Sequence, residues 1–334
     1  MKKIAILGSG TWATALSQVL INNNHDVILW GIDPKQIDDI NFNHKNSFYF
    51  GDEIVLDTKT KATTDLKSAL EGVDYVLLSV PSIAIKEVLL KVNEVLDHKV
   101  VFINTAKGYD PKNNERLSII IENTVPSNLK RGIVSLIGPS HAEEVVVKYL
   151  TAVCSVCEDN EIAKEVQQLF SNEFFRVYTN NDVAGAETCS AMKNSIAIAS
   201  GILDGLGYGD NARAALITRG LNEMVTYGLF SGGKHTTFYG LCGLGDLIVT
   251  CNSRHSRNFM AGHEIGKSNS AKQFLENNSK TVEGIRTTKV IHEIAIKNGL
   301  DLPIINAIYK VIYEDAKPDE IAKQLMIRPL KDEK

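Results

Sequence analysis

The sequence predicts an α/β domain, built on a parallel sheet wound by helices, followed by an all-α domain. In the first half, short apolar runs alternate with amphipathic stretches. These runs are nearly continuous in Val, Ile and Leu, which is typical of strands buried on both faces of a parallel sheet. After about residue 182 the spacing of the apolar residues becomes that of a helix. For a chain of 334 residues we therefore expect two domains, residues 1–182 and 183–334.

The strands of the first domain are predicted from these apolar runs. They cover residues 3–7, 26–30, 74–80, 99–104, 132–137, 151–157 and 174–178. Helical segments are predicted between several of them, at residues 11–22, 65–71, 83–96 and 162–170. Because strands and helices alternate along the chain, the expected arrangement is a sheet covered by helices.

The second domain is predicted to contain long helices separated by glycine-rich joints. The helical periods cover residues 183–203, 211–230, 258–266, 281–298 and 303–312, and a charged helix forms the tail. The joints are the stretches GILDGLGYGDN and GLCGLGDL. No linker of low complexity separates the two halves, so we expect the boundary to fall near residues 180–185.

Composition excludes several classes of function. The net charge is -4 and no long basic block is present, which disfavours a nucleic-acid partner. No run of about 18 apolar residues is present, so no membrane insertion is expected. Five cysteines in this length fit a reducing cytoplasm. Cys154 and Cys157 lie in an alternating strand pattern without a second pair, so we expect no metal site.

A phosphate-binding loop is predicted directly after the first strand. The pattern is G-x-G-x-x-A, formed by Gly8, Ser9, Gly10, Thr11, Trp12 and Ala13. The first glycine permits a tight turn, the second lets a pyrophosphate approach the backbone, and the third small residue lets helix and strand pack closely. This strand–turn–helix context favours dinucleotide binding over the alternative of a glycine-rich turn without a ligand.

The stretch of the second predicted strand ends near Asp33, about 20 residues beyond the loop, where dinucleotide-binding domains place an acid. A carboxylate there accepts hydrogen bonds from the ribose 2′-hydroxyl of NAD. Ile32 adjoins it, and Lys35 is the nearest cation, so nothing next to Asp33 pairs with the 2′-phosphate of NADP. NAD is therefore favoured, with NADP left open. The alternative is that Asp33 only caps the following helix.

Polar groups also follow later strands of the predicted sheet, where parallel sheets bind their ligands. Lys107 precedes a glycine at the end of one strand, where it can aim an ammonium at a ligand or lie in solvent. Ser140 and the amides after it form a possible anion site at a helix start. For His141 we expect no chemistry.

The helical half carries three more candidates. Lys193 lies among small and apolar residues in AETCSAMKNSIAIASGI, and Asp246 lies in the apolar stretch GLGDLIVTC. Asp246 is either a charged partner or a helix N-cap. Arg254, Arg257 and Asn258 form a group suited to forked recognition of phosphate, or are ordinary surface residues.

With these pieces in order, the sequence resembles the NAD(P)-dependent glycerol-3-phosphate dehydrogenases of the bacterial type. The motifs that carry the resemblance span nearly the whole chain: ILGSGTWATAL, LWGIDP, TAKG, GPSHAEEV, RVYTNND, MKNSIAIASGI, GDNARAALITRGLNEM, GLGDLIVTC, SRN, VEGIRTTK and LPI. The resemblance implies a Rossmann domain followed by an all-α domain like the C-terminal domain of 6-phosphogluconate dehydrogenase. It also implies a homodimer that interconverts dihydroxyacetone phosphate and sn-glycerol 3-phosphate for glycerophospholipid synthesis.

The resemblance also assigns roles to residues. Lys193 matches the catalytic acid/base of the family, and Lys107 and Asp246 are expected to act beside it. The expected cofactor contacts are Thr11, Trp12, Lys107, Ala142, Arg257, Thr281 and Glu283. The expected substrate contacts are Lys107, Gly138, Ser140, Lys193, Asp246, Thr250, Ser256, Arg257 and Asn258, with Thr250 the weaker candidate.

The chain departs from the family pattern at two places. Ala13 stands where a second glycine is usual, and Thr188, Cys189 and Ser190 replace a Leu-Gly-Gly run. On a helix, Cys189 and Ser190 fall on the face of Lys193, where they can crowd the lysine or hydrogen-bond it. Two other functions stay open: a related hydroxyacid dehydrogenase, and a dinucleotide-sensing regulator without turnover. A sensor needs no catalytic lysine, so Lys107, Lys193 and Asp246 together argue against the regulator.

Overall fold

The chain folds into two compact units, residues 1–187 and 188–334. The computed structural model describes residues 1–110, 112–278, 282–330 and 332–333. The division between the units falls five residues after the predicted domain boundary, inside helix α9 (Val183–Gly205). The first five residues of this helix belong to unit 1, and the side chain of Glu187 hydrogen-bonds to residues of that unit.

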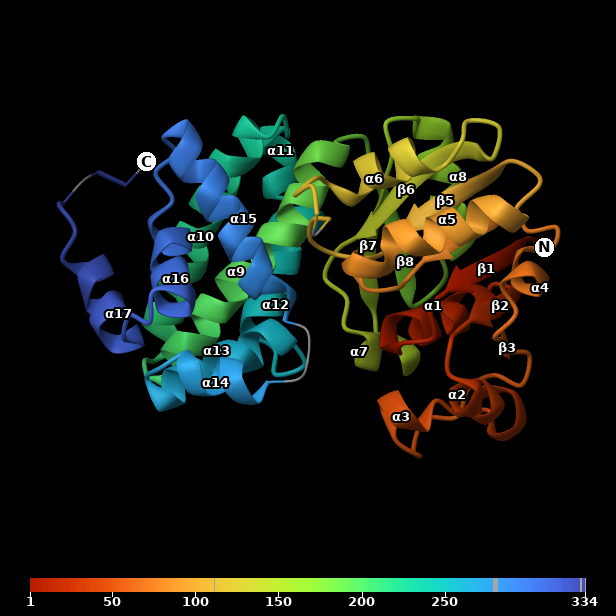
Figure 1. Cartoon of the computed structure of the whole chain (residues 1–334), viewed down its shortest axis with the longest axis horizontal. Helices are drawn as coiled ribbons and strands as arrows, with labels where there is room; N and C mark the ends of the chain where they lie inside the picture. Colours follow the sequence, from red (N-terminus) through yellow and green to blue (C-terminus); the bar gives the residue numbers. More distant parts are fainter. Residues whose placement is uncertain (111, 279–281, 331, 334) are drawn as a thin grey trace. The chain divides into compact units, whose positions relative to one another are not determined.

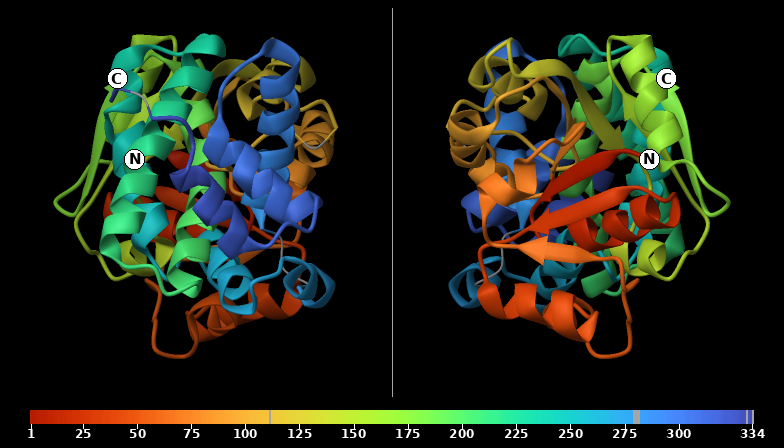
Figure 2. Two further views of the ribbon diagram at one scale, coloured as in Figure 1. Left: turned by 90° about the vertical axis from the view of Figure 1, so that its left-hand side faces the viewer. Right: turned by 90° about the vertical axis from the view of Figure 1, so that its right-hand side faces the viewer.

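Unit 1 is built on one eight-stranded sheet. Its strands are β1 (Lys3–Leu7), β2 (Asp26–Trp30), β3 (Lys61–Thr63), β4 (Tyr75–Leu78), β5 (Val100–Asn104), β6 (Lys130–Ile137), β7 (Thr151–Val156) and β8 (Phe175–Asn180). Their order across the sheet is β3-β2-β1-β4-β5-β6-β7-β8. The right-hand view of Figure 2 shows the first three, coloured red to orange, lying side by side. The chain thus winds outward from β1 in one direction and then, from β4, in the other.

The sheet is parallel from β3 through β6 and changes direction at β7. β7 pairs with β6 in an antiparallel sense, and β8 runs parallel to β7. The parallel arrangement predicted from the sequence is therefore wrong for these last two strands. The connection from β6 to β7 carries only α7 (Ala142–Val146), and the chain returns beside β6 instead of crossing over. Mixed sheets of this kind are common among wound folds.

Helices cover both faces of the sheet, as the continuous apolar runs predict. On one face, α1 (Thr11–Asn22), α7 and α8 (Asn160–Phe170) pack on a core that includes Ile4 and Ile6. On the other face, α4 (Leu66–Leu70), α5 (Ile85–Val95) and α6 (Leu117–Thr124) pack on a core that includes Ala5 and Leu7. The side chains of successive residues of β1 thus pack into the cores on opposite faces of the sheet, as the twofold period of a strand requires.

Several short elements of unit 1 were not predicted. They are the π-helix η1 (Asp39–Asn43), α3 (Ser47–Phe50), β3, the 3-10 turn η2 (Ser82–Ala84) and α6, whereas the sequence indicates a helix start at α2 (Pro34–Asp38) and at α7 without giving their bounds. Most are five residues or shorter, which is too short for a period to emerge. The longer α6 has the sequence LSIIIENT, in which a run of isoleucines hides the helical period.

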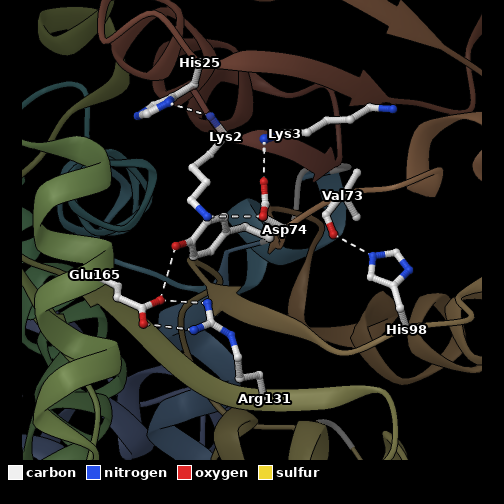
Figure 3. A network of polar contacts seen from close by, with 9 residues as sticks. Lys2, Lys3, His25, Val73, Asp74, His98, Arg131 and Glu165 are labelled. Atoms are coloured by element: carbon white, nitrogen blue, oxygen red, sulfur yellow. Dashed lines mark hydrogen bonds and ion pairs between the residues drawn. The ribbon is translucent and has the colours of Figure 1, made fainter.

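Ion pairs join the amino ends of several strands (Figure 3). Lys2 Nζ lies 3.3 Å from Asp74 Oδ1. Arg131 makes a forked pair with Glu165, at 2.9 and 2.7 Å, and the Tyr75 hydroxyl donates to the same carboxylate. A hollow of about 700 Å³ is lined in part by these residues. It lies at the edge of the sheet opposite the predicted ligand-binding loops, and its carboxylates are already paired.

Unit 2 is helical (green to blue in Figure 1). After α9 its elements are α10 (Asp210–Phe230), α11 (His235–Phe238), the π-helix η3 (Leu241–Gly245), α12 (Asp246–Asn252), α13 (Arg257–Ser268), α14 (Lys272–Asn277), α15 (Glu283–Asn298), α16 (Pro303–Tyr313) and α17 (Pro318–Met326). The five long predicted helices are α9, α10, α13, α15 and α16. The joint predicted at residues 240–247 is η3 running into α12. None of the described helices is both long and apolar enough to cross a membrane.

Helices α9 and α13 cross with their backbones in contact. Each contributes two glycines four residues apart, which are Gly201 and Gly205 on α9 and Gly262 and Gly266 on α13. A Cβ atom on Gly201 would lie 2.0 Å from the carbonyl oxygen of Phe259, and one on Gly262 would lie 2.0 Å from that of Ile198. Small residues at this spacing let two helices approach closely. The crossing places the start of α13 beside the helix that carries Lys193.

A buried carboxylate holds α16 against α10. Glu223 of α10 accepts hydrogen bonds from the backbone N–H groups of Ile304 and Ile305, in the first turn of α16. Those N–H groups have no partner within the helix, and the two carboxyl oxygens of Glu223 satisfy them. Burial nevertheless raises the pKa of Glu223 to about 8.

Candidate active site

The predicted phosphate loop lies where the winding of the sheet reverses. Gly8 follows β1 with a φ of +124°, a backbone conformation that residues other than glycine rarely adopt. A Cβ at this position would lie 2.5 Å from the carbonyl oxygen of Ser79, the residue after β4. β1 and β4 are neighbours from which the chain winds in opposite directions. Parallel sheets bind ligands at such a switch point.

The start of α1 fits a pyrophosphate. Gly10 is its N-cap and contributes no side-chain hydrogen bond to the first turn. A Cβ on Gly10 would have no atom closer than 3.9 Å, a carbon of the Tyr49 ring. The backbone N–H groups of the first turn are thus without a capping side chain and are available to an anion. Ala13 is fully buried and Trp12 packs against the same core, so alanine is accommodated in place of glycine.

Two side chains from later in the chain hold this loop in place. Ser9 Oγ donates to Gln36 Oε1 over 2.6 Å, and Gln36 Nε2 donates to the carbonyl oxygen of Ser9 over 2.6 Å. Asn46 Nδ2 donates to the same carbonyl oxygen over 2.9 Å. The Ser9 hydroxyl is therefore engaged in supporting its own loop. No motif in the sequence marks Gln36 or Asn46 for this role.

Asp33 lies three residues after the end of β2 and caps α2, as the alternative from the sequence states. Its Oδ1 accepts a hydrogen bond from the backbone N–H of Lys35 over 3.0 Å, and Pro34 is the first residue of the helix. The side chain is exposed, as is the neighbouring Ile32, at 84%. Capping and binding of a ribose hydroxyl are compatible, because this cap engages one of two carboxylate oxygens.

The remaining candidates of unit 1 follow β5 and β6, at the same edge of the sheet. Lys107 is half-buried in the loop after β5, which is shaped by a hydrogen bond from the backbone N–H of Ala106 to Asn104 Oδ1. Gly138 directly follows β6, and the Ser140 hydroxyl donates to its carbonyl oxygen over 3.0 Å. Ala142 is buried at the start of α7. Because parallel strands end at one edge, all four belong to that edge.

In unit 2, Lys193 and Asp246 form an ion pair inside the helical core. Lys193 Nζ contacts Asp246 Oδ1, and the two side chains are 2% and 1% exposed. Asp246 is the first residue of α12 and makes no capping hydrogen bond, so the N-cap alternative is wrong. Thr250 donates from its hydroxyl to the carbonyl oxygen of Asp246 over 2.6 Å. Asp246 Oδ2 is buried without a hydrogen-bond partner among the described residues.

This environment is chemically unusual for a lysine. Burying an ammonium and a carboxylate is costly, and a pair recovers that cost only through close contact. Cys251 lies near the pair, and burial raises the pKa of its thiol. A solvent-facing lysine is therefore excluded. Such buried, charged pairs are typical of sites where a proton is moved or a developing charge is stabilised.

The unusual residues before Lys193 are buried in the same helix. Thr188 Oγ1 and Ser190 Oγ have no hydrogen-bond partner among the described residues. The Ser190 hydroxyl therefore does not bind the lysine, which was one of the two effects considered from the sequence. Both hydroxyls are buried polar groups without compensation, and such groups destabilise a fold.

The start of α13 carries the predicted phosphate clamp. Ser256 caps the helix by accepting a hydrogen bond from the backbone N–H of Phe259 over 3.2 Å. Arg257 is exposed at the first helical position, and Arg254 is exposed just before the helix. Asn258 is buried, and its Oδ1 accepts a hydrogen bond from the backbone N–H of Gly284 over 2.9 Å. An arginine at a helix N-terminus suits a phosphate group.

The start of α15 connects to the helix of Lys193. Glu283 Oε2 lies 3.5 Å from Asn194 Nδ2, which donates to it. The structure thus brings Lys193, Asp246 and Thr250 together in one group, and Glu283 and Asn258 together around Gly284 in another. Thr281, predicted to approach the cofactor, lies outside the described residues.

One buried acid was missed by the sequence reasoning. Glu187 of α9 accepts hydrogen bonds from the hydroxyls of Ser118 and Ser135, at 2.6 and 2.8 Å, and lies 3.8 Å from Arg116. Burial raises the pKa of this carboxyl, against the lowering effect of the two serines and the arginine. The network joins α9 to α6 and β6. Nothing in the local sequence distinguishes Glu187 from a surface glutamate.

Taken together, a wound sheet with a glycine phosphate loop and a helical unit with a buried lysine define the class of two-domain, nucleotide-dependent dehydrogenases. Comparison with known families agrees. Residues 3–163 match the N-terminal model, and residues 182–323 the C-terminal model, of NAD-dependent glycerol-3-phosphate dehydrogenase. The chain belongs to this family.

Similar proteins cover nearly the whole chain. It is 51% identical over 315 residues to the glycerol-3-phosphate dehydrogenase [NAD(P)+] of Streptococcus uberis, covering 94% of this chain and 93% of that protein. It is 49% identical over 332 residues to the same enzyme of Streptococcus equi subsp. zooepidemicus, covering 99% and 98%. The crystal structure of glycerol-3-phosphate dehydrogenase from Coxiella burnetii superposes with a TM-score of 0.90 at 35% identity, covering 98% and 99%.

Proposed function

We propose that the protein interconverts dihydroxyacetone phosphate and sn-glycerol 3-phosphate, using NAD or NADP as the hydride carrier. The observation that carries this proposal is the Lys193–Asp246 pair, buried beside helices whose ends suit a phosphate. Family membership supplies the substrate, and the pair supplies a chemical reason for it. A sensor that only bound the dinucleotide would gain nothing from burying these two charges.

Lys193 acts at the carbonyl oxygen in this proposal. Nicotinamide, when bound, supplies or accepts the hydride at the substrate carbon. As the carbonyl is reduced, negative charge develops on its oxygen, and the ammonium of Lys193 stabilises that charge and donates a proton. Asp246 holds the lysine in place, and Thr250 in turn hydrogen-bonds to the backbone of Asp246. In the reverse direction, Lys193 accepts the proton from the alcohol.

Arg257 and Asn258 are proposed to bind the substrate phosphate, with Ser256 beside them. These contacts with the phosphate are remote from the reacting carbon, so their binding energy orients the substrate. From unit 1, we propose that Lys107, Gly138 and Ser140 contribute further substrate contacts. Lys107 is proposed to contact both substrate and cofactor.

The cofactor is proposed to bind at the carboxyl edge of the unit 1 sheet. Gly8 lets the chain turn closely against Ser79, and the start of α1 beside Gly10, which no side chain caps, is left open to the pyrophosphate. Thr11, Trp12 and Ala142 are the further candidates from this unit, and Arg257, Thr281 and Glu283 those from the helical part of the chain. Asp33 beside the exposed Ile32 favours NAD over NADP.

We further propose that the enzyme works in the cytoplasm as a homodimer and supplies sn-glycerol 3-phosphate for glycerophospholipid synthesis. All five cysteines are buried thiols, as suits a reducing compartment. Sedimentation of the purified protein at several concentrations measures the oligomeric state directly. A monomer at all concentrations would refute the dimer without affecting the proposed reaction.

The activity is tested by mixing purified protein with NADH or NADPH and dihydroxyacetone phosphate and following the loss of absorbance of the reduced nicotinamide. We expect oxidation with at least one cofactor, and formation of sn-glycerol 3-phosphate in equal amount. No oxidation with either cofactor would overturn the proposal. Oxidation with 2-ketoacids in place of the triose phosphate would instead support a hydroxyacid dehydrogenase, and cofactor binding without turnover would support a regulator.

A further inference from the structure

The start of α15 meets two other helices at a single glycine. The backbone N–H of Gly284 donates to Asn258 Oδ1 of α13 over 2.9 Å. The carbonyl oxygen of Gly284 accepts a hydrogen bond from Ser195 Oγ of α9 over 3.3 Å. A Cβ on Gly284 would lie 2.5 Å from the carbonyl oxygen of Asn194 and 2.8 Å from Asn258 Oδ1. Three helices are therefore packed at a distance that only glycine allows.

The hydrogen bond from Gly284 fixes which way the Asn258 amide points. A backbone N–H can only donate, so the atom that receives it must be the amide oxygen and not the amide nitrogen. The NH2 group of Asn258 is consequently turned away from Gly284. No described residue accepts a hydrogen bond from it, and it is not among the buried nitrogen and oxygen atoms that lack a partner. Asn258 thus presents two N–H donors at the start of α13.

The surroundings of this NH2 group favour an anion. Asn258 is the second residue of a twelve-residue helix, and Arg257 precedes it. The amino end of such a helix carries partial positive charge. The carboxamide donors and the helix end therefore point to the same kind of ligand, an oxyanion such as a phosphate.

We propose that Gly284 is a positioning residue for the substrate phosphate. Its N–H holds the Asn258 carboxamide with the NH2 group turned to the phosphate. Its lack of a side chain lets α15 lie against the backbone of Asn194, the residue that follows Lys193. The inference rests on the proposed function, since it assigns a phosphorylated substrate to this clamp.

The orientation of the amide is tested with Asn258→Asp. The aspartate can still accept the hydrogen bond from Gly284, but its second oxygen then places negative charge where the NH2 group was. We expect kcat/KM for dihydroxyacetone phosphate to fall by about 10-fold or more, as for loss of a hydrogen bond to a charged group. The loss should fall mainly on KM. The kcat/KM for unphosphorylated dihydroxyacetone should change far less.

The role of Gly284 itself is tested with Gly284→Ala, and Gly266→Ala is the matched control. Both substitutions place a Cβ too close to a backbone carbonyl of α9, at 2.5 Å from Asn194 and 2.3 Å from Ile202 respectively. Both should therefore lower the melting temperature. Only Gly284→Ala places its Cβ directly against Asn258 Oδ1, at 2.8 Å, so this variant should lose more of the preference for the phosphorylated over the unphosphorylated substrate than Gly266→Ala does.

The outcomes separate this inference from the proposed function. A wild-type enzyme that turns over dihydroxyacetone phosphate, with preference for phosphate unchanged in Asn258→Asp, would overturn the inference and leave the function standing. Equal loss of preference in Gly284→Ala and Gly266→Ala would also overturn it, because the effect would then be one of general packing. If Gly284→Ala does not fold, Asn258→Asp still decides. A wild type without turnover would overturn the function, and the inference with it.

Discussion

Lys193 and Asp246 touch each other across α9 and α12 with almost no contact with solvent. The pair therefore differs from the ion pairs at the amino edge of the sheet. In Arg131 and Glu165, for example, both side chains are 40% exposed. A buried pair and an exposed pair are expected to respond very differently to the loss of one member.

Lys193→Met should abolish most turnover and also destabilise the protein. The methionine leaves the Asp246 carboxylate buried without its partner, which costs about 3–5 kcal/mol in comparable cases. The double variant Lys193→Met/Asp246→Asn should recover much of that stability without recovering activity. Urea unfolding and the nicotinamide assay measure the two effects. Full activity in Lys193→Met would rule out its proposed role.

The matched control for this experiment is Arg131→Met. It also breaks an ion pair (Figure 3), but one that is open to solvent, so the loss should stay below about 1 kcal/mol. Turnover should remain at the wild-type level, because this residue lies at the edge of the sheet away from the phosphate loop. Equal destabilisation by Arg131→Met and Lys193→Met would contradict the contrast drawn between the two pairs.

Gly8→Ala and Gly10→Ala should separate folding from cofactor binding. At Gly8 the new Cβ meets the Ser79 carbonyl oxygen at 2.5 Å, and the positive φ adds strain, so the melting temperature should fall. At Gly10 the new Cβ meets no protein atom within 3.9 Å, so stability should be kept. The Cβ would still occupy space used by the pyrophosphate. We therefore expect weaker NADH binding in both variants, measured by fluorescence titration, and loss of stability in Gly8→Ala alone.

Ser190→Ala should leave stability unchanged or raise it. The Ser190 hydroxyl is buried without a partner among the described residues, so removing it removes an uncompensated polar group. The matched comparison is Ser200→Ala on the same helix, where the hydroxyl donates to the Cys251 carbonyl oxygen over 2.8 Å. That variant should lose about 1 kcal/mol. Equal destabilisation in thermal melts would mean that the Ser190 hydroxyl has a partner, such as a buried water.

Glu223→Gln should change how stability depends on pH. Burial raises the folded-state pKa of Glu223 from 4.5 to about 8, so the folded state retains this proton where the unfolded state releases it. The contribution of Glu223 is therefore greatest below pH 4.5 and is lost as pH rises towards 8. In Glu223→Gln the melting temperature should fall less between pH 6 and 8 than in wild type. Glu264→Gln, at an exposed position of α13, should follow the wild-type curve.

Much of the fold was predictable because its strands and long helices carry strong periods. The helix at residues 11–22 and the strand at 3–7 were predicted with the bounds that the structure has. The reversal at β7 was not predictable, because TAVCSVC has the same alternation whichever way the strand runs. β3 escaped notice because three residues show no period.

The site was predictable where a residue type is unusual for its surroundings, and not elsewhere. A lysine within a small, apolar helix and an acid within GLGDLIVTC were visible as candidates, and the structure pairs them. Gln36, Asn46 and Glu187 act through contacts with residues distant in sequence. Their local sequences are ordinary, so only the fold reveals what they hold. The role of Gly284 likewise depends on contacts with Asn194 and Asn258, which lie 90 and 26 residues earlier in the chain.

The glycine crossing of α9 and α13 has a consequence for evolution. Where two helices touch through side chains, a substitution can widen or narrow the gap by a methylene at a time. Here the backbones themselves are in contact, and no such gradual adjustment is available. The separation between the lysine on one helix and the arginine on the other is thus set by main-chain geometry. A lineage that came to prefer a longer or shorter substrate would have to reshape its loops, since the distance between α9 and α13 cannot change in small steps.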